Sequence, residues 1–221
     1  MTEAVKRPYR SPRRDQQASE TRRAVAVAAL ELFTEQGFTE TAIRQVAERA
    51  SVSDQTIYKA FGDKIGLLCE AAAQYIETGG AGTEVAFQAA LAAEPDPIER
   101  FRMVARTSRE LWESGALELD LMLNGTEIHD PRLEELQRRS LAYKLESTRA
   151  ACEILFPDSI RRPDFTLDEI AALGTAMDSA ATVTTLQALG WSMDRWEQWV
   201  VEFLTMFLDP AHEARWRGSG S

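Results

Sequence analysis

Hydrophobic residues recur every three or four positions along most of this chain, the spacing that places them on one side of an α-helix. The first such stretch follows Ser19, a suitable N-cap, places Val25, Leu32 and Phe33 on one side, and ends at Gly37. No stretch alternates with a period of two, and no glycine-rich turn joins two candidate strands. The pattern therefore predicts an all-α fold of about nine helices.

Three shorter helices are predicted next. The first covers residues 41–50, and Ser53 then caps a helix that reaches about Phe61. A further helix is predicted over residues 64–78, where the glycines of residues 79–82 are expected to end it.

The second half repeats this pattern with longer helices, each of which begins at a capping residue. Aspartate-proline pairs open two of them, a Thr-x-x-Glu capping box opens the third, and a serine opens the last. These helices are predicted from Asp96-Pro97 to about Gly115, from Asp130-Pro131 to about Phe156, from Thr166 to about Gly190, and from Ser192 to before Pro210.

The two short helices before Phe61 have the spacing of a helix-turn-helix, whose second helix can enter the major groove of DNA. At about 100° per residue, Ile57 and Phe61 share the inner face of that second helix. The outer face carries polar side chains that suit base edges, thymine methyl groups and phosphates. These outer residues are Gln55, Thr56, Tyr58 and Lys59. A solvated surface helix displays similar residues, so that alternative stays open.

Further phosphate contacts are expected around this helix. Thr41 and Arg44 are predicted on the outer side of the preceding helix. Lys64 begins the following helix, where its ammonium and the free backbone N–H groups could share one phosphate.

The charge is unevenly distributed along the chain, although its net value is -10. Residues 1–64 carry 11 Lys and Arg against 9 Asp and Glu, whereas residues 65–221 carry 14 against 26. A polyanion would therefore meet the N-terminal end. Residues 1–18 are interpreted as a flexible basic arm, either a solvated tail or an additional DNA contact.

Residues 19–68, with GFTETAIRQVAERASVSDQTIYKAFGDKIGLL at their centre, resemble the DNA-binding domain of TetR-family transcriptional regulators. The matching positions are Gly37, Phe38, Thr41, Ile43, Val46, Ala47, Val52, Ser53, Thr56, Tyr58, Phe61 and Lys64. Three positions depart from the family pattern. Ser51 replaces the usual glycine of the turn, Ala60 replaces a frequent His or Tyr, and Ile65-Gly66 replaces a common acidic residue and its small neighbour.

The resemblance implies a helix-turn-helix DNA-binding domain over residues 19–64 and a larger effector-binding and dimerisation domain over residues 65–217. It implies a homodimeric repressor that binds an inverted-repeat operator and is released by a small apolar or amphipathic effector. DNA contacts are expected from Ser53 as well as from the residues named above. The alternative is a helical protein-interaction adapter without sequence-specific DNA binding. The last four residues, 218–221, resemble a cloning remnant.

The last predicted helix bears apolar residues over an arc of about 200°, whereas one core needs little more than 100°. A wrapped helix within one chain or a second subunit could cover this excess, and the resemblance favours the second subunit. The dimer interface is predicted to include Ala180, Thr184, Trp196, Trp199, Phe203 and Phe207. Large apolar residues elsewhere could line an effector pocket, although such residues more often form core. These pocket candidates are Phe87, Met103, Trp112, Met122, Tyr143 and Met177.

Several function classes receive no support from the sequence. It has no nucleophile elbow, no phosphate-binding glycine loop and no spaced Cys/His set, so neither an enzyme, a cofactor nor a metal site is expected. Two cysteines cannot form a disulfide scaffold. Neither a membrane span nor a secretory signal is apparent, and a cytoplasmic location is expected.

Overall fold

The computed structural model describes residues 12–124 and 129–211, and this part of the chain is helical without any β-strand. The all-α prediction is therefore confirmed. The elements are α1 (Pro12–Gln36), α2 (Ile43–Arg49), α3 (Asp54–Phe61), α4 (Lys64–Ala93), α5 (Pro97–Leu111), the π-helical segment η1 (Trp112–Ala116), α6 (Leu117–Asn124), α7 (Pro131–Leu155), α8 (Leu167–Met177), α9 (Ala180–Ala188) and α10 (Met193–Thr205). The predicted cloning remnant, residues 218–221, lies outside the described residues.

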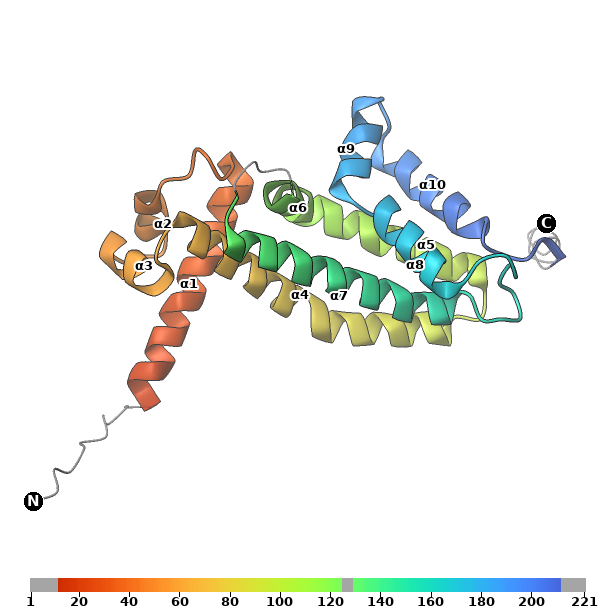
Figure 1. Cartoon of the computed structure of the whole chain (residues 1–221), viewed down its shortest axis with the longest axis horizontal. Helices are drawn as coiled ribbons and strands as arrows, with labels where there is room; N and C mark the ends of the chain where they lie inside the picture. Colours follow the sequence, from red (N-terminus) through yellow and green to blue (C-terminus); the bar gives the residue numbers. More distant parts are fainter. Residues whose placement is uncertain (1–11, 125–128, 212–221) are drawn as a thin grey trace, which may run out of the picture. The chain divides into compact units, whose positions relative to one another are not determined.

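The chain divides into two compact units, with the boundary between Gln74 and Tyr75. The first unit contains α1, α2, α3 and the beginning of α4, and α2 lies beside α1 (Figure 1). Its interior consists of apolar side chains from all four helices, each at most 7% exposed. These include Val25, Ala29, Leu32, Phe33, Val46, Ala47, Ile57, Phe61, Leu67 and Leu68.

The first helix begins earlier than predicted, at Pro12 rather than after Ser19. Residues 12–18 of the expected flexible arm are therefore helical, and residues 1–11 of that arm lie outside the described part of the chain. Proline fits the first turn of a helix because its missing N–H has no intrahelical partner there. Gln16 donates to Glu20 one turn later, at 3.0 Å, which adds local support to this exposed stretch.

The predicted end of α4 at residues 79–82 is wrong, because the helix continues to Ala93. Glycine in a helix costs about 1 kcal/mol relative to alanine, but it keeps its backbone N–H and C=O for the helical hydrogen bonds. Buried residues on both sides hold the helix in place: Leu67 and Leu68 before the glycines, and Leu91 after them.

The second unit contains the rest of α4 and all later helices. Within it, α10 packs against α5, and α7 packs against α8 (Figure 1). The predicted caps are confirmed: side chains of Asp96, Asp130, Thr166 and Ser192 each accept a backbone N–H at the start of a helix. In this unit the sequence pattern located helix starts well because capping is a local interaction.

One predicted helix is divided in the structure. The stretch from Thr166 to about Gly190 is predicted as a single helix, but α8 ends at Met177 and α9 begins at Ala180. Ser179 caps α9 by accepting the N–H of Thr182 at 3.3 Å. Asp178, at the break, accepts a hydrogen bond from the indole of Trp112 at 2.7 Å, a tertiary contact that sequence spacing cannot reveal.

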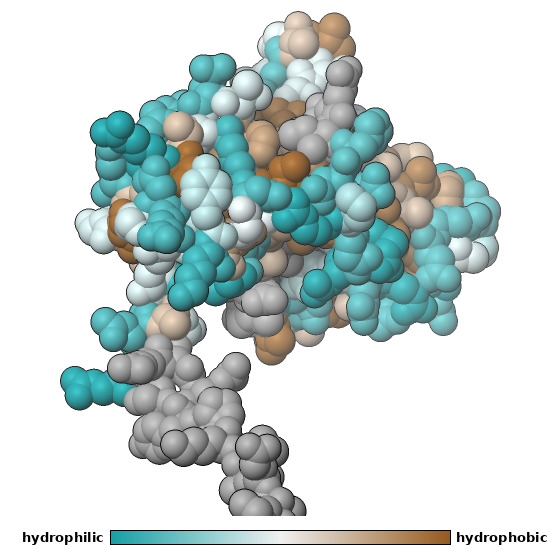
Figure 2. Space-filling view, turned by 60° about the vertical axis from the view of Figure 1, so that its left-hand side comes forward, coloured by the Kyte–Doolittle hydropathy of each residue, from teal (hydrophilic) through white to brown (hydrophobic). Residues whose placement is uncertain are grey.

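None of the described helices combines the length and apolar character needed to cross a membrane. Hydrophilic residues predominate on the face shown in Figure 2, and hydrophobic residues appear there in small groups.

Candidate nucleic-acid interface

The turn between α2 and α3 has the geometry of a Schellman motif. The N–H of Ser51 donates to Glu48 O at 3.2 Å, and the N–H of Val52 donates to Ala47 O at 2.9 Å. Ser51 occupies the position that needs a left-handed backbone, with φ at +54°. Glycine is usual there because a Cβ atom makes this conformation unfavourable. Ser51 therefore adopts the backbone conformation that glycine would take there without steric cost.

The start of α3 is held by Ser53, as predicted. Its Oγ accepts the N–H of Thr56 at 3.2 Å and lies 2.9 Å from the hydroxyl of Thr56. The Thr56 hydroxyl therefore already has a partner within the chain, and Ser53 caps the start of α3.

The two faces of α3 differ as the spacing predicted. Ile57 is 1% exposed and packs inward together with Phe61. On the opposite side Gln55 and Lys59 are exposed, and Tyr58 beside them is 52% exposed. Within the described parts of the chain, no side chain bonds to Gln55 or Lys59. The amide and ammonium groups are therefore available to an outside partner.

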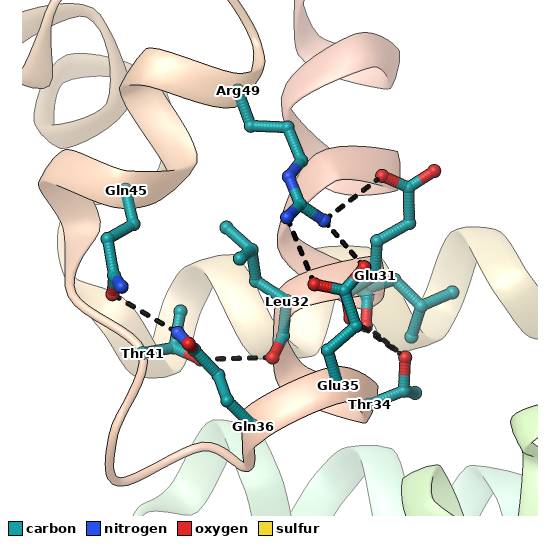
Figure 3. A network of polar contacts seen from close by, with 9 residues as sticks. Glu31, Leu32, Thr34, Glu35, Gln36, Thr41, Gln45 and Arg49 are labelled. Carbon is teal, nitrogen blue, oxygen red and sulfur yellow. Dashed lines mark hydrogen bonds and ion pairs between the residues drawn. The ribbon is translucent and has the colours of Figure 1, made fainter.

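Thr41 is not on the outer surface, contrary to the prediction. It is 1% exposed, and its hydroxyl donates to Gly37 O at 2.8 Å. Leu32 O, at 3.2 Å, is a second acceptor (Figure 3). Gln36 donates to the Thr41 hydroxyl and to Gln45. Thr41 therefore fixes the end of α1 against the start of α2 and cannot offer its hydroxyl to a phosphate.

Figure 3 also shows how α2 is attached to α1 on its other side. Arg49 makes a two-point ion pair with Glu35, with N–O distances of 2.8 and 3.0 Å, and reaches Glu31 at 3.7 Å. The hydrogen bonds from Arg49 lower the pKa of Glu35. Both partners are largely exposed, so this pair contributes mainly to the orientation of α2.

Arg44 lies on the exposed side of α2, as predicted. Its guanidinium is 79% exposed and pairs with Glu48 one turn later at 2.8 Å. An exposed pair of this kind contributes little to stability, so Arg44 could exchange Glu48 for a phosphate at little cost.

Lys64 begins α4, as predicted, but its ammonium already has partners. It donates to Thr39 O at 3.1 Å and lies 4.5 Å from the ring centroid of Phe38. Partial burial lowers the pKa of Lys64. The nearby N–H of Gly66 is bonded to the carboxylate of Asp63 at 2.7 Å. A phosphate at this helix start would therefore compete with Asp63, and Lys64 has two further N–H donors to offer it.

Arg22 was not singled out from the sequence as a functional residue, yet it holds the far end of α3. Its guanidinium makes a two-point ion pair with Glu70 of α4, at 2.9 and 2.7 Å. The same group donates to Ala60 O at 2.8 Å and lies 4.7 Å from the centroid of Phe61. These partners are 38 to 48 residues away in sequence, so no local signal identifies them.

The predicted dimer residues differ in exposure within the second unit. Ala180, Trp196 and Phe207 are at most 1% exposed inside the single chain. These three cannot form the predicted dimer surface, because α10 packs on α5 and Phe207 makes edge contacts with Phe156 and other rings. The remaining three, Thr184, Trp199 and Phe203, are partly exposed.

Four of the six predicted pocket residues belong to the hydrophobic core of the second unit or pack against it. Trp112 and Met177 are buried in this core, and Phe87 and Met103 pack against it. Met122 is partly buried, whereas Tyr143 is 40% exposed. Their role in a pocket stays a prediction.

Comparison with known proteins agrees with this geometry. Residues 26–72 match the model of "Bacterial regulatory proteins, tetR family". Among curated proteins, none matches this sequence.

Solved structures of low sequence identity share the fold. A putative transcriptional regulator from Saccharomonospora viridis in complex with choline has a TM-score of 0.68 at 20% identity, covering 86% of this chain and 99% of that one. A putative TetR-family regulator from Mesorhizobium loti gives 0.66 at 19% identity, over 85% and 96% of the two chains. NalD from Pseudomonas aeruginosa, the secondary repressor of the MexAB-OprM multidrug efflux pump, gives 0.62 at 20% identity, over 88% and 98%. The chain therefore carries the helix-turn-helix domain of the TetR family of bacterial regulatory proteins, within a fold shared with solved TetR-family regulators.

Proposed function

We propose that this protein is a homodimeric transcriptional regulator that binds an inverted-repeat operator through α3. The observation that carries the proposal is a helix fixed at both ends whose exposed face has two side chains, Gln55 and Lys59, that bond to none of the described residues. Ser53 fixes its start and Arg22 its end, while Gln55 and Lys59 remain free to bind a partner. Gln55 is assigned to base edges and Lys59, Tyr58 and Arg44 to phosphates.

The regulation we propose is repression relieved by a small molecule in the cytoplasm, without enzymatic activity. NalD is described as a repressor, and the Saccharomonospora viridis regulator was solved with choline, which supports a ligand-responsive repressor. The helix α4 contributes residues to both units, so a ligand that favours one position of α4 could change the position of α3. Partly exposed Thr184, Trp199 and Phe203 are assigned to the dimer interface.

Selection of bound duplexes from a random library at moderate salt tests the DNA-binding proposal. We expect enrichment of inverted repeats, because two-fold symmetry places two copies of α3 on equivalent half-sites. Failure to enrich any sequence would contradict the proposal and favour the protein-interaction adapter.

Two variants separate base reading from phosphate binding. Gln55→Ala should relax the preference at one base pair of each half-site, a loss of about 1–3 kcal/mol of discrimination. Lys59→Ala should weaken binding to every duplex and reduce its salt dependence. Gln198→Ala, which changes an exposed glutamine in α10, is the matched control and should do neither. An unchanged base preference in Gln55→Ala would refute its reading role.

A further inference from the structure

A polar cluster lies at the break between α8 and α9, beside the hydrophobic core of the second unit. Asp178 occupies the break, Trp112 belongs to η1, and Ser108 belongs to α5. The carboxylate of Asp178 accepts the indole N–H of Trp112 at 2.7 Å. The chain thus brings a carboxylate, an aromatic ring and a hydroxyl together from three elements.

The negative charge of Asp178 is not balanced by a direct ion pair with any of the described residues. Two charged groups act on the Asp178 carboxylate through space: Lys144 lowers its pKa, and Asp120 raises it. Lys144 pairs with Asp120 at 3.1 Å, so these two largely neutralise each other. No nearby cation is therefore left over to pair with Asp178, and burial raises the pKa of its carboxyl group.

The hydroxyl of Ser108 lies beside the same carboxylate. Ser108 is 8% exposed, and its Oγ makes no hydrogen bond of normal geometry with any described residue. Thr175, one turn before Asp178 in α8, likewise has a buried hydroxyl with no partner in the part of the chain that the structure describes. Native proteins leave few buried polar groups unpaired, and those that remain often have a ligand, ion or water as partner.

The backbone beside Trp112 is also unusual. The segment η1 is kinked at Gly115, which has a non-helical backbone with φ +97° and ψ 1°, between α5 and α6. A cation already lies near the ring of Trp112, since the Lys144 ammonium is 5.5 Å from the centroid of this ring.

We propose that Asp178, Ser108 and Trp112 bind the head group of a monocationic amphiphile, an alkylammonium, as the effector of this regulator. The inference rests on the proposed ligand-responsive function and names its ligand class. Asp178 would balance the positive charge, Ser108 would accept an ammonium N–H, and Trp112 would contribute its ring face. The alkyl chain would contact the surrounding core, to which Met177 and Ala116 belong.

Calorimetric titration of the full chain with octylammonium and with neutral 1-octanol tests this site. We expect octylammonium to bind the natural chain at least tenfold more tightly than octanol. Asp178→Asn keeps an oxygen acceptor for Trp112 but removes the charge, so it should weaken octylammonium binding at least tenfold and leave octanol binding unchanged. Asp158→Asn, which changes a carboxylate that is 90% exposed, is the matched control and should alter neither affinity.

Equal affinity for the two probes, or unchanged octylammonium binding in Asp178→Asn, would overturn the inference. If Asp178→Asn shows no cooperative urea transition, Ser108→Ala provides the test, and we expect a loss of several-fold for octylammonium alone. Duplex selection needs no ligand, so the two proposals can fail separately. Operator enrichment without preferential octylammonium binding refutes this site, whereas octylammonium binding without operator enrichment refutes the proposed function.

Discussion

The helices α3 and α10 are both predicted to present contact surfaces, but the predicted residues differ in exposure between the two helices. In α3 the polar residues Gln55 and Lys59 are exposed as predicted. In α10 the predicted contact residue Trp196 is 1% exposed inside its own chain, and Phe207 just beyond the helix is fully buried. A short polar face was thus easier to place than a wide apolar one.

The difference has a physical origin. Burying amide and ammonium groups without partners is costly, so a polar face opposite a buried apolar stripe stays in water in almost any packing. An apolar face gains free energy against any apolar surface, whether from the same chain or from another. Polarity therefore predicts exposure, whereas apolarity predicts burial without identifying the partner.

The largest expected effect concerns the inner face of α10. Trp196→Ala should lower the free energy of unfolding by about 3–5 kcal/mol, because it removes a fully buried ring from the core. Gln198→Ala, at an exposed position of the same helix, is the control and should change stability by less than about 0.5 kcal/mol. Urea unfolding followed by circular dichroism measures both. Equal losses would contradict the burial of Trp196.

The corresponding test in α3 compares its two faces. Ile57→Ala should cost about 2–5 kcal/mol because Ile57 is buried in the first unit. Gln55→Ala should change stability by less than about 0.5 kcal/mol, as surface substitutions usually do. A large loss of stability in Gln55→Ala would mean that this face is not free.

The attachment of α3 by Arg22 should have an intermediate effect. Glu70→Gln removes the negative charge that pairs with Arg22 but keeps the shape of the side chain. The free energy of unfolding should fall by about 1–2 kcal/mol, because the pair is partly buried and hydrogen bonds to charged groups are worth about 1.5–3 kcal/mol. Chemical denaturation measures the loss. Glu48→Gln, in an exposed pair with Arg44, is the control and should cost less.

A stabilising change is expected at the turn between α2 and α3. Ser51→Gly should raise the free energy of unfolding by about 1 kcal/mol, because glycine adopts the left-handed backbone of position 51 without steric cost. The urea midpoint should rise with an unchanged slope. A lower midpoint would mean that the gain in chain entropy of the unfolded state outweighs the relief of strain.

The smallest effect is a pH dependence with opposite signs at two aspartates. The pKa of Asp178 is raised by partial burial, so folding disfavours its charged form, and the cost grows as pH rises above the ordinary value of 3.8. The stability of Asp178→Asn relative to the natural chain should therefore increase as pH rises through this range.

Asp130 provides the opposite case. Hydrogen bonds from Arg132 lower the pKa of Asp130 to about 2, so its stabilisation is present above pH 3.8 and is lost as pH falls toward 2. Asp130→Asn should therefore lose stability relative to the natural chain as pH rises. Urea unfolding over a pH series measures both differences, and slopes of the same sign would contradict these assignments.

The amino-acid sequence by itself determined the helical class, the capped helix starts and the two faces of α3. Asp96, Thr166 and Ser192 illustrate why, since each caps a helix through atoms two or three residues away. The left-handed backbone at Ser51 was likewise implied by the family pattern of the turn. Such features depend on neighbours in sequence, and spacing is enough to locate them.

The tertiary structure alone decided which residues the chain uses for itself. Thr41 was predicted at the surface but bonds to backbone carbonyls of α1 and the turn after it, and Trp196 was predicted at an interface but fills the core. Arg22 reaches Glu70 across 48 positions, and Asp178 reaches Trp112 across 66. These contacts depend on how distant helices pack. The sequence around a hydroxyl, a guanidinium or an indole looks the same whether its partner is another part of the chain or an outside molecule.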